Sequence, residues 1–205
     1  MRINKGILIV FEGIDGTGKT TQAQILFDKL ISHGLETVYF REPSTGRWGQ
    51  EVKKKAAQTD SITPEEELEL FQRDRQENVR ENLRPALDEN KVVILDRYYF
   101  STIAYQGAKG IDQQRIRRIN EAFVVIPDMV FIMDIDPGKG LDRIANRKKK
   151  DLLFEQEDYL KKVRMIFQSF QGKNILHLDS ARSIEEVAEE IEKSVFDYLG
   201  SFILH

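Results

Sequence analysis

The sequence contains no cysteine among its 205 residues. This absence excludes disulfides, zinc thiolate sites and thiol catalysis, and it favours a reducing, cytoplasmic compartment. Long apolar runs are also missing: the longest, GILIVF, is far shorter than a membrane span, and the basic MRINK start is not followed by a long apolar region with a cleavage site. We therefore expect a cytoplasmic protein with no membrane partner.

A basic excess is missing as well, since the formal net charge is -3 and the pI is about 5.8. Proteins that bind the phosphate backbone usually carry such an excess, so we predict no nucleic-acid partner. Internal repeats, low-complexity tracts and linkers rich in proline or glycine do not occur. With 40% hydrophobic residues the chain can bury one core, and we predict a single domain over residues 1–205.

Short apolar runs alternate with helical patterns along the chain. The runs are rich in Val, Ile and Phe, as expected for strands buried on both faces: GILIVFE, ETVYFRE, VVILD, DMVFIMDID and NILHLD. Apolar positions three and four apart predict helices over residues 19–33, roughly 64–89, 112–124, 138–148, 156–171 and 183–199. The pattern predicts an α/β fold in which a central five-stranded parallel sheet has helices on both faces. Ligands of such sheets bind at the carboxyl ends of the strands.

The segment GIDGTGKT, from Gly13 to Thr20, satisfies the P-loop pattern GxxxxGK(S/T) between a predicted strand and a predicted helix. Glycines let backbone N–H groups curl around a phosphate, Lys19 would neutralise the outer phosphates, and Thr20 would hold a magnesium ion. The expected contacts to the nucleoside triphosphate are Gly13, Ile14, Asp15, Gly16, Thr17, Gly18, Lys19, Thr20 and Thr21. The alternative is an ordinary glycine-rich turn with a surface lysine. A G-protein switch is disfavoured, because neither Asn-Lys pair continues as NKxD.

The strand VVILD ends in Asp96 and runs directly into RYYFSTIAYQG. A carboxylate at the end of an apolar strand is well placed to organise magnesium through its water shell, and Arg97 would face the ligand side of the sheet. A helical segment would put Ser101 and Tyr105, four residues apart, on one face, with Gln106 next to them. That face suits a sugar and a base. The alternative for Asp96 and Arg97 is a structural ion pair.

The predicted long helix has a guanidinium inside its apolar stripe. Arg75 stands where an apolar residue should bridge Phe71 and Val79 at helical spacing. A buried guanidinium is too costly unless an anion or a bidentate acceptor meets it, and Phe71 one turn earlier could stack on a ring. The alternatives are that Phe71 is plain core, and that Arg75 pairs with a carboxylate such as Glu77 or Asp74.

These segments together resemble bacterial thymidylate kinases. FEGIDGTGKTTQ, REP, ELFQRDR, ILDRYYFSTIAYQG and DIDPGKGLDRIANR occur in the family's order and at its separations over essentially the whole chain. The resemblance implies a P-loop kinase fold with a short lid at about residues 146–155. It also implies phosphoryl transfer from ATP to dTMP, giving dTDP and ADP for dTTP synthesis, with Mg2+ as cofactor and a homodimer as the assembly.

The resemblance also implies roles for individual residues. Phe71 stacks on the thymine, and Arg75 and Gln106 read its polar edge. Arg97 binds the acceptor phosphate, Ser101 lies near the base, and Tyr105 packs against the deoxyribose. Asp15 matches the family's carboxylate at the 3'-hydroxyl. The catalytic set expected from this resemblance is Lys19, Arg97, Asp15, Lys148 and Lys149.

The sequence departs from the family at two places. Where some relatives carry a P-loop arginine this chain has Gly16, so the lid, NRKKKD, must supply the cation, with Arg147 near ATP. The lid departs from the family pattern because no arginine follows Arg147, and Lys148, Lys149 or Lys150 is expected on the transferred group. The alternative is a solvated basic helix end. REPSTGRWGQEV replaces the usual REPGGT, which leaves acceptor selectivity open while Arg47 is expected at the acceptor phosphate; the family commonly has a cis bond before Pro43.

Two other functions remain possible on the sequence alone. One is a kinase of the same fold that acts on another nucleotide or nucleoside. The other is a P-loop regulatory ATPase with no small acceptor. An acceptor panel in a coupled ADP assay distinguishes them, because only a kinase is stimulated by its acceptor.

Overall fold

The computed structural model describes residues 2–56, 62–144 and 150–204. Its centre is a five-stranded sheet of order β3-β4-β2-β5-β6, in which every neighbouring pair is parallel. The strands of this sheet are β2 Ile7–Glu12, β3 Thr37–Arg41, β4 Val92–Asp96, β5 Met129–Asp134 and β6 Ile175–Asp179. The predicted α/β fold with a five-stranded parallel sheet is confirmed, and each strand lies in one of the five apolar runs.

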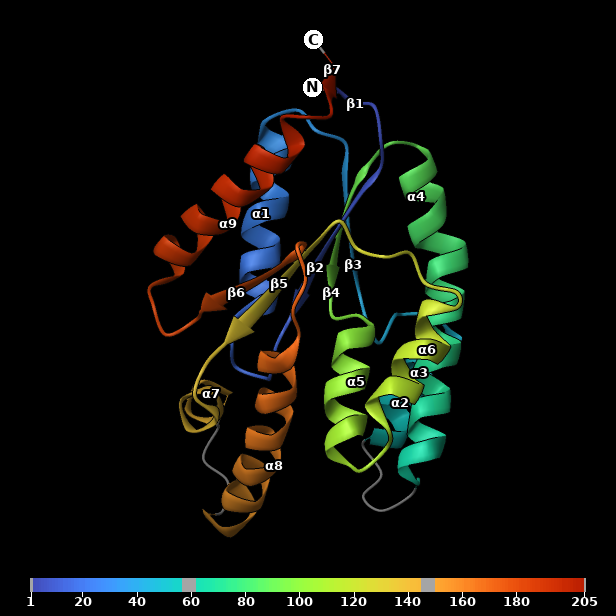
Figure 1. The fold of residues 1–205 in the computed structure, drawn as a ribbon, viewed down its shortest axis with the longest axis vertical. Helices are drawn as coiled ribbons and strands as arrows, with labels where there is room; N and C mark the ends of the chain where they lie inside the picture. The colour runs from blue at the N-terminus through green and yellow to red at the C-terminus, as the bar shows by residue number, and fades with distance from the viewer. Residues whose placement is uncertain (1, 57–61, 145–149, 205) are drawn as a thin grey trace.

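Helices cover both faces of the sheet (Figure 1). They are α1 Lys19–Ser32, α2 Arg47–Ala56, α3 Pro64–Asn78, α4 Arg84–Asp88, α5 Tyr99–Ala108, α6 Gln113–Glu121, α7 Pro137–Ile144, α8 Lys150–Ser169 and α9 Ile184–Leu199. Two of these helices begin with a capping box: Thr63 pairs with Glu66 at the start of α3, and Ser183 pairs with Glu186 at the start of α9.

The sheet separates two apolar cores because its strands are buried on both faces. Alternate residues of β2 illustrate this: Ile7, Ile9 and Phe11 pack with α1 and α9, whereas Leu8 and Val10 pack with α3, α5 and α8. All six residues of β2 are buried. The central strand therefore has little freedom to shift, and the loop that follows it is held at a fixed place.

The helical segment predicted over residues 64–89 is interrupted by a π-helical turn, η1 Val79–Leu83. The backbone N–H of Arg84 donates to the carbonyl of Val79, five residues back, and Pro85 follows without an N–H to donate. A proline inside a helix clashes with the carbonyl four residues before it, and a wider turn relieves that clash. The segment stays helical, and α4 continues to Asp88.

Three elements were not expected from the sequence. Helix α2 follows the REPST turn, where a polar, lysine-rich segment gave no clear apolar stripe. Strands β1 Arg2–Ile3 and β7 Ile203–Leu204 pair antiparallel and bring the two chain ends together (Figure 1). In the described part of the chain, the helices are all too short or too polar to cross a membrane.

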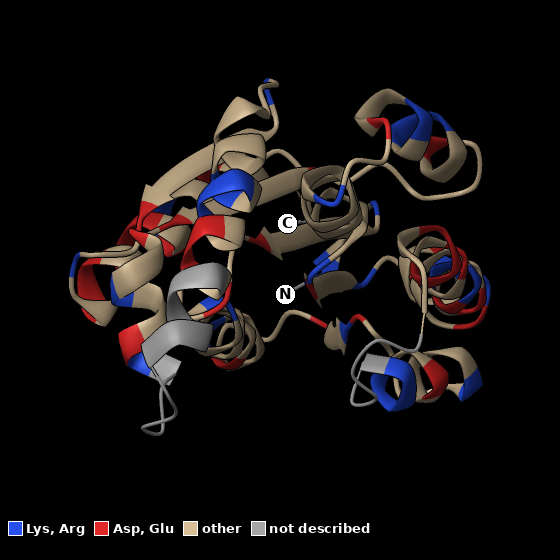
Figure 2. Cartoon of the chain, turned by 90° about the horizontal axis from the view of Figure 1, so that it is seen from below, with Lys and Arg blue, Asp and Glu red and all other residues tan. Residues whose placement is uncertain are grey.

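The register of the sheet gathers polar residues at one edge. Phe11 of β2 pairs with Asp96 of β4, and Arg41 of β3 pairs with the same Asp96. Glu12, Arg41 and Asp96 therefore end their strands side by side, next to the loop before α1. Figure 2 shows the molecule from below, with acidic and basic residues interspersed over the surrounding helices rather than separated by sign. The candidate site lies at the carboxyl ends of the strands.

Candidate active site

The P-loop connects β2 to α1 and depends on glycine at two positions. Gly16 has a φ of +82°, and a Cβ there would lie 2.2 Å from the carbonyl oxygen of Gly140; Gly13 has a φ of +138°, and its Cβ would lie 2.3 Å from the carbonyl oxygen of Met133. Both backbones are strained for other residues and neither has room for a side chain. An arginine at position 16 would not fit this loop, so Gly16 cannot be replaced by the cation that some relatives carry.

Lys19 is the first residue of α1 and is 6% exposed. Its ammonium donates to the carbonyl of Ile14 at 2.6 Å and to Thr17 Oγ1 at 3.2 Å. Burial, reinforced by the positive charge of Arg97, lowers the pKa of Lys19 to about 7. A phosphate beside this ammonium would supply the negative charge that the buried cation lacks.

Asp96 lies fully buried at the end of β4, and its two oxygens differ. Oδ2 accepts from Thr20 Oγ1 at 2.5 Å and from the Tyr39 hydroxyl at 3.2 Å. Oδ1 is buried and has no hydrogen-bond partner among the described residues. A carboxylate oxygen left unpaired beside a P-loop hydroxyl fits the water shell of Mg2+, which is usually held by one or two carboxylates together with substrate phosphates.

Arg97 begins the connection from β4 to α5 with a φ of +73°, a backbone conformation that costs energy in a residue other than glycine. Its guanidinium donates to the Gly13 carbonyl at 3.2 Å, to Ser101 Oγ at 3.0 Å and to Asp15 Oδ1 at 2.5 Å. The ring of Tyr105 lies 5.3 Å from the guanidinium carbon. Arg97 and Asp96 thus have different partners, and the predicted alternative of an ion pair between them is wrong.

Asp15 and Tyr105 complete the group around Arg97. Although burial opposes the shift, Arg97 and Lys19 hold the pKa of the Asp15 carboxyl below its usual range. The Tyr105 hydroxyl donates to Asp15 Oδ2 at 3.4 Å, and burial raises the pKa of this phenol to about 12. Asp15 is therefore a carboxylate and Tyr105 a neutral phenol at neutral pH.

Glu12 holds the start of α5 against β2. Its buried carboxylate accepts from the backbone N–H groups of Tyr98 and Ser101, at 2.8 and 3.1 Å, and from Ser101 Oγ at 2.5 Å. Burial raises the pKa of Glu12. The Ser101 hydroxyl is thus occupied by Glu12 and Arg97, and it acts on the site mainly by fixing the Arg97 guanidinium.

A pocket beside the P-loop brings together most of the residues predicted for the acceptor. Its lining comes from the P-loop, the turn after β3, α3, α5 and α8: Asp15, Glu42, Pro43, Glu67, Phe71, Arg75, Arg97, Tyr98, Ser101, Thr102, Tyr105, Gln106, Lys109 and Tyr159. Phe71 is partly exposed on this pocket, so it is not plain core. The pocket combines aromatic rings with a few buried polar groups, as small-molecule sites usually do.

Arg75 is 1% exposed, and its charge is met by Glu42 rather than by Glu77 or Asp74. Nε donates to Glu42 Oε2 at 2.8 Å, and Nη2 lies 2.7 Å from the same oxygen. The predicted alternative of a carboxylate partner for Arg75 is confirmed, but this carboxylate comes from the turn after β3 and not from α3. Burial raises the pKa of Glu42 to about 7, although Arg75 opposes this shift.

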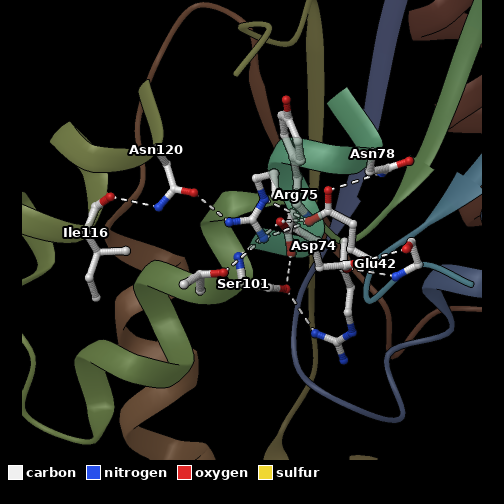
Figure 3. A network of polar contacts seen from close by, with 12 residues as sticks. Glu42, Asp74, Arg75, Asn78, Ser101, Ile116 and Asn120 are labelled. Carbon is white, nitrogen blue, oxygen red and sulfur yellow. Dashed lines mark hydrogen bonds and ion pairs between the residues drawn. The ribbon is translucent and has the colours of Figure 1, made fainter. Parts of the chain in front are cut away.

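Two further side chains fix the Arg75 guanidinium, as Figure 3 shows for Asn120. Nη1 donates to Asn120 Oδ1 at 2.6 Å, and Nη2 donates to Thr102 Oγ1 at 3.0 Å. Asn120 is anchored in turn, because its amide donates to the Ile116 carbonyl at 2.8 Å. Most of the guanidinium's donors are therefore taken by the protein, which leaves it in one orientation at the pocket wall.

A second pocket lies on the other side of the P-loop. Its lining comes from the P-loop, α1, α7 and the start of α9: Gly16, Thr17, Gly18, Thr21, Gln22, Met133, Arg143, Ser180, Arg182, Ser183, Ile184 and Val187. Arg143 donates to the carbonyls of Gly16 at 3.4 Å and Ser180 at 3.0 Å. Ser180 Oγ and Arg182 Nε are buried without hydrogen-bond partners among the described residues. Because Asp15 lines the first pocket and Gly16 the second, the P-loop separates the two.

The far end of the loop REPSTGRWG, at Arg47 and Trp48, does not line the acceptor pocket. Arg47 is exposed and is absent from the lining of the acceptor pocket; its guanidinium carbon lies 4.9 Å from the Trp48 ring centroid. The peptide bond between Glu42 and Pro43 is cis, as the resemblance implies. The buried Asp74 carboxylate accepts from the Ser44 backbone N–H at 2.8 Å and from its hydroxyl at 2.5 Å.

The predicted lid residues Arg147, Lys148 and Lys149 lie outside the described residues.

Several residues around the site were not predicted. Glu12 ends a buried strand with a charge, and Ser180 follows the strand NILHLD, so position at a strand end could have identified both. Tyr39 gave no such signal, because an aromatic residue inside a strand is typical of core. Asn120 and Thr102 reach Arg75 from other helices, and one sequence does not reveal such a contact.

Comparison with known proteins gives one consistent result. A family model described as Thymidylate kinase matches residues 11–191. The chain is 44% identical over 191 residues to the thymidylate kinase of Akkermansia muciniphila, covering 93% of this chain and 92% of the relative. It is 40% identical over 194 residues to the probable thymidylate kinase of Archaeoglobus fulgidus, covering 95% and 97%. The thymidylate kinase of Brachyspira hyodysenteriae is 39% identical over 191 residues, covering 93% and 94%.

Proposed function

Because the chain belongs to the thymidylate kinase family, we propose that the two pockets beside its P-loop bind the two substrates of that reaction, ATP and dTMP. The chain is an ATP-dependent dTMP kinase, a nucleoside monophosphate kinase that produces dTDP and ADP. The observation that carries the assignment of the pockets is their separation by consecutive P-loop residues, Asp15 and Gly16. An acceptor and a donor bound there would meet at the loop.

The first pocket takes dTMP. Phe71 offers its ring to the thymine, and Arg75 and Gln106 are the buried polar groups that meet the edge of the base. Tyr105 and Asp15 lie near the sugar, where the Asp15 carboxylate, which already accepts from Arg97 and Tyr105, has further lone pairs for a 3'-hydroxyl. Arg97 binds the acceptor phosphate and aligns it with the donor. Supporting this arrangement, these residues share one pocket, and hydrogen bonds fix the Arg97 guanidinium.

The second pocket takes the adenosine of ATP, and the triphosphate runs along residues 13–21. Backbone N–H groups of the loop and of the first turn of α1 meet the phosphates. An oxygen of the dTMP phosphate attacks the γ-phosphorus, a new O–P bond forms, and the bond to the β-phosphate oxygen breaks. Lys19 and Arg97 stabilise the charge that spreads over the transferred group.

The residues present fit a magnesium ion. Thr20 and Asp96 would hold it, with Oδ1 of Asp96 available to its water shell. When bound, Mg2+ neutralises charge on the β- and γ-phosphates. Among the described residues there is no cluster of three or more acidic or histidine side chains that would form a separate metal cage. The site thus suits a metal that arrives with the nucleotide.

Three expectations extend this proposal. Residues Arg147 to Lys150 close over the reacting phosphates and supply the cation that Gly16 cannot. The protein is cytoplasmic, which agrees with its lack of cysteine. It assembles as a homodimer. Each is supported by the sequence or the family alone.

An acceptor panel tests the substrate assignment. In a coupled ADP assay dTMP should be the best acceptor, and dUMP should be weaker because it lacks the methyl group, a loss of roughly 1 to 3 kcal/mol. Faster turnover of CMP, AMP or GMP would overturn the assignment of the first pocket. ATP hydrolysis without acceptor stimulation would favour a regulatory ATPase instead.

A further inference from the structure

Gln106 presents an unpaired oxygen at the acceptor pocket. The residue is 2% exposed and contributes to the lining. Its amide nitrogen donates to Glu67 Oε2 at 3.0 Å, whereas its amide oxygen is buried and has no hydrogen-bond partner among the described residues. A buried acceptor without a donor is costly, so a ligand that brings an N–H to this oxygen gains affinity.

Glu67 determines which end of the Gln106 amide is left without a hydrogen-bond partner among the described residues. An ionised carboxylate accepts hydrogen bonds and donates none, so it can pair only with the amide nitrogen of Gln106. The Lys109 ammonium forms an ion pair with the same carboxylate oxygen, so this oxygen accepts from two donors. If the Gln106 amide were reversed, its oxygen would face the Glu67 oxygen. The two charged residues thus hold the amide in one orientation.

We propose that Glu67, acting through Gln106, is a positioning residue that selects a pyrimidine with an N–H at ring position 3. This inference rests on the proposed function of the first pocket as the dTMP site. Thymine and uracil carry a hydrogen at N3 and can donate to the Gln106 oxygen. Cytosine has a lone pair at N3, so two acceptors would face each other. Sites that pair with a specific polar group reject its mismatch far more strongly than apolar pockets reject a missing methyl group.

The test compares three acceptors on the wild type and on Glu67→Gln. A glutamine at position 67 can accept or donate, so it no longer imposes one orientation on Gln106. The ratio of kcat/KM for dTMP to that for dCMP should fall at least about tenfold. The ratio for dTMP to dUMP should stay within about twofold, because both bases donate from N3. A loss of fold stability or of catalytic power would lower all three values together and leave both ratios unchanged.

Glu65→Gln is the matched control. Glu65 lies on the same helix, α3, and pairs with Arg115 of α6 at 2.7 Å, but it does not line the pocket. Its substitution removes the same charge and should leave both ratios unchanged. Should Glu67→Gln not be recovered folded, Glu67→Met keeps the length of the side chain, removes the acceptor and makes the same prediction.

The outcomes distinguish a failure of the role of Glu67 from a failure of the proposed function of the first pocket. A wild-type protein that prefers dTMP, with an unchanged dTMP to dCMP ratio in the folded Glu67 variant, overturns the role of Glu67 alone. An equal fall of that ratio in Glu65→Gln overturns it too, because the effect would then be one of surface charge. A wild type that does not phosphorylate dTMP overturns the assignment of the pocket itself.

Discussion

Thr20 donates to Asp96 across a 2.5 Å hydrogen bond, although the two residues are 76 positions apart. This bond ties the first turn of α1 to the end of β4. Because Thr20 and Tyr39 share one carboxylate oxygen, the other is left buried and unpaired. The protein holds Oδ2, and under the proposed function Oδ1 would face the water shell of the magnesium ion.

In Asp96→Asn the side chain no longer has two oxygens for these two contacts. The amide is neutral and keeps only one acceptor oxygen, so it cannot accept from Thr20 and serve a magnesium water shell with separate oxygens, as the carboxylate can. We expect kcat to fall at least about 100-fold, or about 2.7 kcal/mol. The affinity for a fluorescent ATP analogue should also lose its dependence on Mg2+ when titrations with Mg2+ and with EDTA are compared. Asp28→Asn, on the exposed side of α1, is the control; an equal Mg2+ dependence in both variants would contradict the assignment.

Tyr39→Phe should produce a smaller effect of the same kind. The phenol contributes one 3.2 Å hydrogen bond to Asp96 Oδ2, while Thr20 still holds that oxygen. The ring remains packed against the core beneath it. A net loss of about 0.5 to 1.5 kcal/mol is expected for one such bond, seen as a severalfold fall in kcat with unchanged KM for dTMP. A change confined to KM would place Tyr39 in acceptor binding instead.

The lowered pKa of Lys19 predicts that the protein takes up protons when ATP binds. Its pKa in the free protein is about 7 because the cation is buried beside Arg97, and bound triphosphate raises it. At pH 8 the free protein therefore holds Lys19 mostly neutral, and binding should take up a proton at this site; at pH 6 it should take up almost none. Titration calorimetry in buffers of different ionisation enthalpy measures the uptake.

Lys19→Met isolates the contribution of this residue from that of ATP itself. The rise in proton uptake between pH 6 and pH 8 should disappear, and turnover should fall by orders of magnitude. The same pKa determines how the stability of the free protein changes with pH. The unfolded chain binds the Lys19 proton up to a pH near 10.5, so this group makes the free protein more stable as pH rises from about 7 to about 10.5. Equal proton uptake in wild type and variant would contradict the lowered pKa.

The sequence predicted the scaffold well, for a physical reason. Strands buried on both faces must be nearly all apolar, so β2 and β4 are visible as unbroken runs. Residues directly after those strands, such as Gly13 and Arg97, are brought to one edge by the parallel topology alone. The P-loop and its neighbourhood could therefore be located without coordinates.

Contacts between distant segments were not predictable in the same way. Arg75 was correctly expected to need a partner, but Glu42 is 33 positions away and reaches it through a turn, and Asn120 is 45 positions away on another helix. Helix periodicity reports which face is buried and not what lies against it. The displacement of Arg47 from the acceptor pocket has the same origin, since the start of α2 sets its direction.

Residues 147–149 of the basic run lie outside the described residues, and the role of the run stays a prediction from the sequence. Replacing Lys148, Lys149 and Lys150 together with glutamine keeps length and polarity and removes three charges. We expect kcat to fall at least about tenfold, or 1.4 kcal/mol, with little change in dTMP affinity. Single-turnover kinetics and dTMP titration measure the two quantities. An unchanged kcat would identify the lysines as a solvated helix end.

Asp74 should be essential to the loop that distinguishes this chain from the REPGGT pattern. Its buried carboxylate accepts from both the backbone N–H and the hydroxyl of Ser44. In Asp74→Asn only one acceptor oxygen remains, so the Ser44 hydroxyl must turn and accept from the amide NH2, and both bonds lose the strength that the carboxylate charge gives them. This should reduce the free energy of unfolding by about 1 to 3 kcal/mol and raise KM for dTMP, because the adjoining Pro43 lines the acceptor pocket.

Ser44→Ala separates the two bonds to Asp74, since it keeps the backbone N–H and Cβ and removes only the hydroxyl. About 1 kcal/mol should be lost, clearly less than in Asp74→Asn. Glu69→Gln is the control on the same helix, because its exposed i,i+4 pair with Arg73 should matter by less than about 0.5 kcal/mol. Urea unfolding measures all three variants. If Asp74→Asn proved as stable as Glu69→Gln, the carboxylate would not anchor the loop, and the position of Pro43 would have to depend on the packing of α2 against α3.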